Sequence, residues 1–284
     1  MSIRIITDSA ADLGEAFVSD HEVRIAPLRT IFPDGEYLQG VNLTAEQFYE
    51  KLIESTEVPR TSQATPYDFE CLFEEAVAAG DDVVAIILSS KLSGTYNSAM
   101  TAAQSYEGRV FVVDSLSVTI GQQILVERAV QLREEGLNAA EIAQKLEIEK
   151  NQLVVIAALD TLEYLKKGGR VSSAVAIAGG ILNIKPVIGI VDGAVELVGK
   201  ARGSKQSNNL LRTKVFEAGG IDYSRPIRIG YTGLSDSILK KYLRDSADLY
   251  EGRIEGEIPV THIGAVIGTH AGPGAVAVSF FRAE

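Results

Sequence analysis

The segment "VVAIILSSKLSGTYNSA" (residues 83–99) decides the fold class, because an apolar run leads directly into a loop rich in hydroxyl groups. The apolar run, from Val83 to Leu88, is typical of a strand buried on both faces of a parallel sheet. The loop Ser89–Thr95 contains one glycine, and the segment after it has the composition of a helix. A strand that passes through such a loop into a helix predicts an α/β fold with a mainly parallel sheet.

The same alternation of strand and helix continues on both sides of this segment. "IRIITD" (3–8) and "RVFVVDS" (109–115) are predicted as strands of the same sheet, and 23–32 as one extended segment. Helix starts are indicated by polar residues at capping spacing: Ser9 with Asp12, Thr44 with Gln47, Thr65 with Asp68, and Asn138 with Glu141. Helices are predicted over 118–135 and 139–149.

The second half of the chain has a different pattern. "LVVIAAL" (153–159) is predicted as a strand, and "KPVIGIVDGAVELVG" (185–199) as two strands around an Asp-Gly turn. Further strands are predicted at 228–233 and 274–281. Because a hairpin belongs to an antiparallel arrangement, we expect an N-terminal α/β domain at 1–155 and a C-terminal α/β domain with a mixed sheet at 156–284.

Composition narrows the class of protein. The chain has 284 residues and a net charge of −11, which disfavours nucleic acid as a partner and allows at most transient contact with an anionic membrane. The single cysteine, Cys71, excludes an internal disulfide and is predicted as a buried helix thiol in a reducing cytoplasm. No secretory signal is expected from the start of the chain, and the longest apolar stretch (172–191) is too interrupted to span a bilayer.

Candidate ligand contacts follow the predicted strands. In open parallel sheets, ligands bind beyond the carboxyl ends of the strands. Polar stretches are expected there at 7–9, 61–63, 89–95 and 114–115. Ser9, Thr44 and Thr65 are interpreted as helix caps alone, whereas Thr61 and Ser93 are not needed as caps. These two hydroxyls, with Ser62, Gly94 and Thr95 beside them, suit a weak anion such as a carboxylate.

The second half adds two further candidates for this site. Arg170 follows a Gly-Gly pair and precedes a helix of small residues, so its guanidinium is expected to reach a cleft. His270 stands in "GTHAGPGAVAV", interpreted as a glycine-rich turn with close backbone approach. His21 and His262 are interpreted as ordinary structural residues.

The sequence lacks the motifs of several common binding sites and catalytic sites. Three histidines and one cysteine without metal-ligand spacing argue against a zinc site, and no metal or cofactor is predicted. "GAVELVGKA" and "GPGAVA" are incomplete versions of phosphate-loop and dinucleotide-binding motifs. No G-x-S-x-G sequence is present, which disfavours the hypothesis of a hydrolase that uses Ser93 and His270. The hypothesis stays open as an alternative.

Six motifs together resemble the DegV family of fatty-acid-binding proteins over residues 3–282: "IITDSAADL", "TSQATPYDF", "LSSKLSGTYNSA", "VVDSLSVTIGQ", "LEYLKKGGRVSS" and "GTHAGPGA". The resemblance implies a two-domain α/β protein with a long-chain fatty acid, such as palmitate, in a tunnel between the domains. It also implies a separate fatty acid kinase as partner. On matching positions, Thr61 and Ser93 would hold the carboxylate with Arg170 and His270 close by, and Arg202 would face the partner.

Three functions therefore remain open. The leading hypothesis is a cytoplasmic fatty-acid carrier in lipid transport or fatty acid metabolism, without catalytic activity of its own. The first alternative is a lipid or small-ester hydrolase that uses Ser93 and His270. The second is an interaction module for a kinase without a ligand of its own. In the carrier, small apolar residues at 174–182 are candidates for the tunnel wall, although ordinary helix packing explains them equally well.

Overall fold

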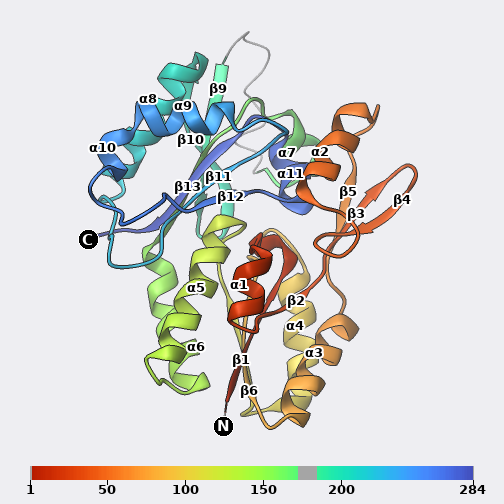
Figure 1. Ribbon diagram of the computed structural model, residues 1–284. Helices are drawn as coiled ribbons and strands as arrows, with labels where there is room; N and C mark the ends of the chain where they lie inside the picture. Colours follow the sequence, from red (N-terminus) through yellow and green to blue (C-terminus); the bar gives the residue numbers. More distant parts are fainter. Residues whose placement is uncertain (1, 172–183, 284) are drawn as a thin grey trace.

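The computed structural model describes residues 2–171 and 184–283, and their strands form three β-sheets. The parallel sheet and its helices make up the lower part of the molecule in Figure 1, and a mixed sheet with its own helices lies above them. A small antiparallel sheet lies beside the junction of these two parts. The predicted tunnel-wall residues at 174–182 lie outside the described residues.

The parallel sheet has the order β2-β1-β6-β7, and every neighbouring pair is parallel, as predicted. Its strands are β1 (Ile3–Asp8), β2 (Arg24–Ala26), β6 (Asp82–Ile87) and β7 (Val110–Asp114). Helices pack on both faces, with α3 (Pro66–Ala78) and α4 (Thr95–Ala103) on one, and α5 (Ile120–Glu134) and α6 (Ala139–Glu149) on the other. The short α1 (Glu15–Asp20) and the 3₁₀ turns η1 (Ser9–Ala11), η2 (Gln104–Tyr106) and η3 (Lys150–Gln152) complete this part.

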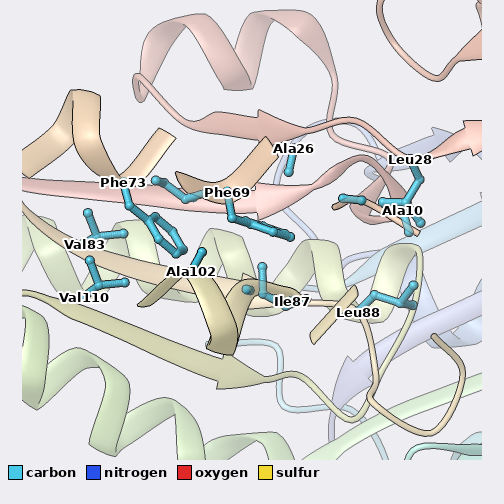
Figure 2. Packing of buried hydrophobic residues seen from close by; sticks show 14 of the residues in the cluster. Ala10, Ala26, Leu28, Phe69, Phe73, Val83, Ile87, Leu88, Ala102 and Val110 are labelled. Atoms are coloured by element: carbon cyan, nitrogen blue, oxygen red, sulfur yellow. The ribbon is translucent and has the colours of Figure 1, made fainter. Parts of the chain in front are cut away.

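The core on the α3 face shows why these segments fold together. Figure 2 shows Phe69 and Phe73 of α3 pointing toward the sheet residues Val83 and Ile87, and both rings are fully buried. Burial of each phenylalanine contributes about 1.5–3 kcal/mol. The start of α3 is fixed as predicted, because Thr65 and Asp68 form a reciprocal capping box.

The mixed sheet has the order β10-β9-β8-β13-β11-β12. Its strands are β8 (Leu153–Ala158), β9 (Ile184–Val191), β10 (Ala194–Arg202), β11 (Arg228–Tyr231), β12 (Val260–His262) and β13 (Val276–Phe281). One face packs against α8 (Gly203–Glu217), α9 (Ser237–Asp245) and α10 (Ala247–Tyr250). The predicted hairpin is confirmed, since Asp192 and Gly193 both have positive φ, at 48° and 81°, as a two-residue type I′ turn requires.

Successive residues of β8 point to opposite faces of this sheet. Ile156 and Ala158 pack into the core under α8 to α10. Val155 and Ala157 point to the other face, toward the parallel-sheet part of the molecule. Residues of β13 alternate in the same way, and Ala277 pairs directly with Ala157. The face toward the junction therefore carries two adjacent alanines, and their small side chains leave open space between this face and the parallel-sheet part of the molecule.

The small antiparallel sheet was not predicted. It consists of β4 (Gly35–Leu38), β3 (Arg29–Phe32) and β5 (Arg60–Ser62), with α2 (Ala45–Glu54), α7 (Glu163–Gly168) and α11 (Ala265–Ala271) nearby. The prediction of one extended segment over 23–32 is wrong, because β2 and β3 belong to different sheets. Pro27 separates them, and its missing N–H cannot continue a strand ladder.

Two predicted side-chain environments are also wrong. Ser9 does not cap a helix. Its Oγ accepts a hydrogen bond from the Leu28 N–H at 2.9 Å. The cap at this position is Asp8, whose carboxylate accepts a hydrogen bond from the Ala10 N–H. Cys71 is exposed, because Phe69 and Phe73 are four positions apart on the buried face of α3 and Cys71 points away from it. No helix within the described ranges is long and apolar enough to cross a bilayer.

Candidate functional site

A cavity of about 280 Å³ lies between the loops of the parallel sheet and the inner face of the mixed sheet. Its volume is near the lower end of the roughly 300–1,000 Å³ typical of small-molecule pockets. The apolar lining comes from both parts of the molecule: Leu28, Leu88, Leu92, Val118, Val155, Ala157, Leu159, Leu165, Ile188, Ile190, Val195, Ile263, Val266, Ile267, Ala271, Ala275 and Ala277. Such a lining suits an alkyl chain.

Polar residues line part of the same cavity. They are Thr61, Ser62, Gln63, Ser93, Thr119, Arg170 and His270. Gly94 lies among them, so six of the seven predicted carboxylate-site residues line one space. The exception is Thr95, whose side chain is buried behind Ser93. Residues from β5, the loop after β6, the end of α7 and α11 meet here, although they lie far apart in the sequence.

Thr61 and His270 are in direct contact. Thr61 Oγ1 lies 2.9 Å from His270 Nε2. Thr61 belongs to β5, where it pairs with Thr30 of β3, so a strand ladder fixes its backbone. A threonine hydroxyl that accepts from the imidazole N–H can donate its own proton to a carboxylate oxygen in the cavity.

The expectation that His270 stands in a glycine-rich turn is wrong, because it lies in the last turn of α11. Burial, and then the positive charge of Arg170, lower the pKa of His270 to about 4. The ring is therefore neutral at pH 7 and acts as a hydrogen-bonding group. Its Nδ1 is buried and has no hydrogen-bond partner in the described part of the chain.

The loop after β6 presents Ser93. Its Oγ lies 2.9 Å from Thr95 Oγ1 and accepts from the Thr95 N–H at 3.2 Å, so Ser93 does take part in starting α4, contrary to the sequence interpretation. Gln63 packs over Gly94: a Cβ on this glycine would lie 2.1 Å from Gln63 Oε1. Gln63 in turn donates to Ser98 Oγ at 3.0 Å, which fixes the loop against β5.

Arg170 is the only ionisable side chain among the described lining residues apart from His270. It is exposed, and its Nε donates to the Leu92 carbonyl at 3.3 Å while Nη1 donates to the Gly168 carbonyl at 2.8 Å. Arg170 therefore brings a positive charge to the rim of the cavity, beside the loop that carries Ser93. This is the charge that an anionic head group needs nearby.

The other predicted residues and chemistries lie elsewhere or lack the necessary geometry. Arg202 is exposed at the end of β10 and does not line the cavity. Ser93 and His270 each bond to a different threonine, so the described contacts contain no nucleophile–base hydrogen bond. No cluster of three or more potential metal ligands occurs among the described residues.

Gly168 at the end of α7 is a site residue that the sequence interpretation missed. A Cβ at this position would lie 2.1 Å from His270 Nδ1, so the imidazole packs directly on the glycine. We expect Gly168→Ala to push the ring away from Thr61, lower stability by about 1–3 kcal/mol and shift the ¹⁵N resonances of the His270 ring. Gly14→Ala, whose Cβ would meet nothing within 4 Å, is the control. Unchanged His270 resonances in Gly168→Ala would contradict this packing.

The arrangement matches a known family. A family model described as "Uncharacterised protein, DegV family" matches residues 2–283. This chain belongs to the DegV family. The membership suggested by the six sequence motifs is therefore confirmed, as is the α/β fold class with one parallel and one mixed sheet.

Other DegV proteins resemble this chain over nearly its full length. A DegV domain-containing protein of Deinococcus radiodurans is 36% identical, with 98% of both chains covered. A solved structure of a Thermus thermophilus DegV family protein, described by its fatty acid binding, has a TM-score of 0.88 and 33% identity, covering 98% of this chain and 99% of that one. A stearic acid-binding protein from Eubacterium ventriosum has a TM-score of 0.85 and 26% identity, covering 98% and 97%.

Proposed function

We propose that this DegV protein binds one long-chain fatty acid, with the alkyl chain in the cavity between residues 1–155 and 156–284. The carboxylate would lie at Thr61 and Ser93, with Arg170 and His270 beside it. The single observation that carries this proposal is an apolar cavity whose polar lining consists of hydroxyl, amide and imidazole groups with one guanidinium at its rim. Fatty acid binding in the Thermus thermophilus relative supports the same ligand class.

The energetics favour an alkyl chain as the main source of affinity. About 14 methylenes of a palmitate-length chain, at about 0.8 kcal/mol each, supply about 11 kcal/mol before the cost of ordering the ligand. A carboxylate must keep its hydrogen bonds when it leaves water. Thr61 and Ser93 can supply such bonds, and Arg170 offsets the charge. The head group thus fixes orientation while the tail supplies the attraction.

The exposure of Arg170 supports a role in presenting the head group to a partner. Because this side chain is both exposed and part of the cavity lining, the carboxylate would lie near the surface. In our proposal a separate fatty acid kinase acts on it there, and Arg202 is a candidate contact for that partner. The protein then serves as a carrier in lipid transport or fatty acid metabolism. The missing Ser93–His270 hydrogen bond disfavours the hydrolase alternative.

Solvent extraction and mass spectrometry of the purified protein should find one fatty acid per chain. After delipidation, we expect Thr61→Val combined with Ser93→Ala to weaken palmitate binding by at least about 100-fold, since each hydrogen bond to a charged group contributes about 1.5–3 kcal/mol. Ser90→Ala, in the same loop but outside the cavity lining, should bind like wild type. Wild-type protein that binds no fatty acid in titration calorimetry would refute the proposal.

A further inference from the structure

Helix α11, which carries His270, is capped from outside its own sequence. Its N-cap residue is Gly264, which has no side chain to satisfy the first N–H groups. Asp12 Oδ1 accepts from the Gly264 N–H at 2.9 Å, and Gln39 Oε1 accepts from the Val266 N–H at 2.7 Å. The N-cap of α11 is therefore formed by side chains that precede their partners by 252 and 227 positions in the sequence.

The two capping side chains are held rigidly. Gln39 Nε2 donates to Asp12 Oδ1 at 2.7 Å and to the Ser9 carbonyl at 2.6 Å. Thr119 Oγ1 lies 2.6 Å from Asp12 Oδ2. The glycine at 264 makes room for them, because a Cβ there would lie 2.5 Å from Gln39 Nε2 and 2.7 Å from Asp12 Oδ1. The contact is thus closely packed as well as hydrogen-bonded.

The small antiparallel sheet contacts both ends of α11. Gln39 directly follows β4 and bonds to the start of the helix, whereas Thr61 of β5 bonds to His270 in its last turn. Both strands pair with β3. Gly264 and His270 are six residues apart, which corresponds to about 9 Å of helix. A displacement of the capped end would therefore be transmitted along one short helix to the imidazole.

We propose that Asp12 and Gln39 are positioning residues for the head-group site, because their cap on α11 holds His270 in place beside Thr61. This inference rests on the proposed fatty-acid function for its effect on affinity. The effect on the position of the imidazole is independent of any ligand. Neither residue lines the cavity, so neither would contact the fatty acid itself. Asp12 also bonds to Thr119, which does line the cavity, and a His270→Ala background distinguishes that route from the one through the helix.

The first test compares three variants of the delipidated full-length chain in palmitate titrations. We expect Asp12→Ala to weaken binding at least tenfold. Asp12→Asn, which keeps an acceptor for Gly264 and offers a donor to Thr119, should stay within threefold of wild type. Leu146→Ala in α6, a fully buried core position away from the cavity, controls for lost stability and should change affinity less than twofold. Should Asp12→Ala fail to fold, Gln39→Ala replaces it, with an expected loss of three- to tenfold.

A double-mutant cycle separates positioning from general damage. In a His270→Ala background, Asp12→Ala should weaken palmitate binding less than twofold further, because the group that it positions is gone. The ¹⁵N resonances of the His270 ring in ligand-free protein should shift in Asp12→Ala and not in Leu146→Ala. The inference would be overturned if the affinity losses of the two single variants multiplied in the double variant. Unchanged His270 ring resonances in Asp12→Ala would also overturn it. Absence of palmitate binding by wild type would instead refute the proposed function, and the ring resonances would still decide the positioning.

Discussion

Ala157→Phe is expected to weaken the binding of a palmitate-length fatty acid about 200-fold while the protein stays folded. Ala157 of β8 and its partner Ala277 of β13 lie side by side on the cavity face of the mixed sheet. A phenyl ring there would fill space that the alkyl chain needs. If it excludes about four methylenes at about 0.8 kcal/mol each, the loss is about 3 kcal/mol, or roughly 200-fold in affinity.

The neighbouring residue supplies a matched control for this prediction. Ala158 points to the opposite face, into the core beneath α8 to α10. Ala158→Phe should therefore lower the free energy of unfolding by about 1–3 kcal/mol through overpacking and leave fatty acid affinity nearly unchanged. The affinities for a short-chain acid such as octanoate should differ little between Ala157→Phe and wild type. Equal losses of palmitate affinity in both variants would show that the alkyl chain does not lie over Ala157.

The regular elements could be predicted because local patterns determine them. The Asn138–Glu141 capping box sets the start of α6 as predicted, and the observed helix covers Ala139–Glu149. The apolar strands β6 and β7 also lie where their composition indicates. The capping residues interact within a few positions of one another, and each strand is marked by its own run of apolar residues, so local sequence carries the necessary information. The small antiparallel sheet was not predicted, because its short strands form only when the fold brings β5 beside β3.

The candidate site was predictable in its chemistry and not in its geometry. Hydroxyl-bearing stretches predicted at the ends of strands indicated Thr61 and Ser93, and both line the cavity. The predicted place of Thr61 is wrong, because Thr61 lies within β5 of the antiparallel sheet and not after a strand of the parallel sheet. The packing of Gly168 on His270 and the role of Asp12 could not be read from spacing, because these contacts join elements far apart in the chain. Asp12 was interpreted as part of a local helix start, whereas its carboxyl group bonds across to α11. One signal was present in the sequence: glycines at 264, 268 and 272 recur every four residues, as expected for a helix packed closely on one side.

Asp12→Asn is expected to raise the free energy of unfolding at pH 8 by up to about 4 kcal/mol. Burial raises the pKa of Asp12 to about 7 from an ordinary value of 3.8, and its hydrogen bonds only partly oppose this. Between these two values the unfolded chain has lost the proton that the folded chain retains. Stability therefore falls as pH rises through this range, and the full penalty, about 1.4 kcal/mol for each of about three pH units, persists above pH 7.

The neutral asparagine removes this penalty without removing the cap. Its amide oxygen can accept from Gly264 and its amide nitrogen can donate to Thr119, and asparagine tolerates the left-handed backbone at this position, where φ is 51°. Asp8, whose pKa is raised to about 6 by burial, remains in both proteins, and its charge is one of the causes that raise the pKa of Asp12. The difference between their urea denaturation curves therefore reports Asp12 together with its interaction with Asp8. That difference should vanish below about pH 4 and grow to its maximum above pH 7.

The opposite sign is expected at Asp81, which provides the control. The hydrogen bond from Ser2 and the ion pair with Arg4 lower the pKa of this carboxyl group. A carboxyl group with a depressed pKa stabilises the protein at pH values above its pKa in the unfolded chain, and this stability is lost as pH falls. Asp81→Asn should therefore lower the free energy of unfolding at pH 8 and have a smaller effect at acidic pH. A variant Asp12→Asn that is less stable than wild type at pH 8 would mean that the ionised carboxylate, and not the neutral acid, is the form that the fold prefers at the start of α11.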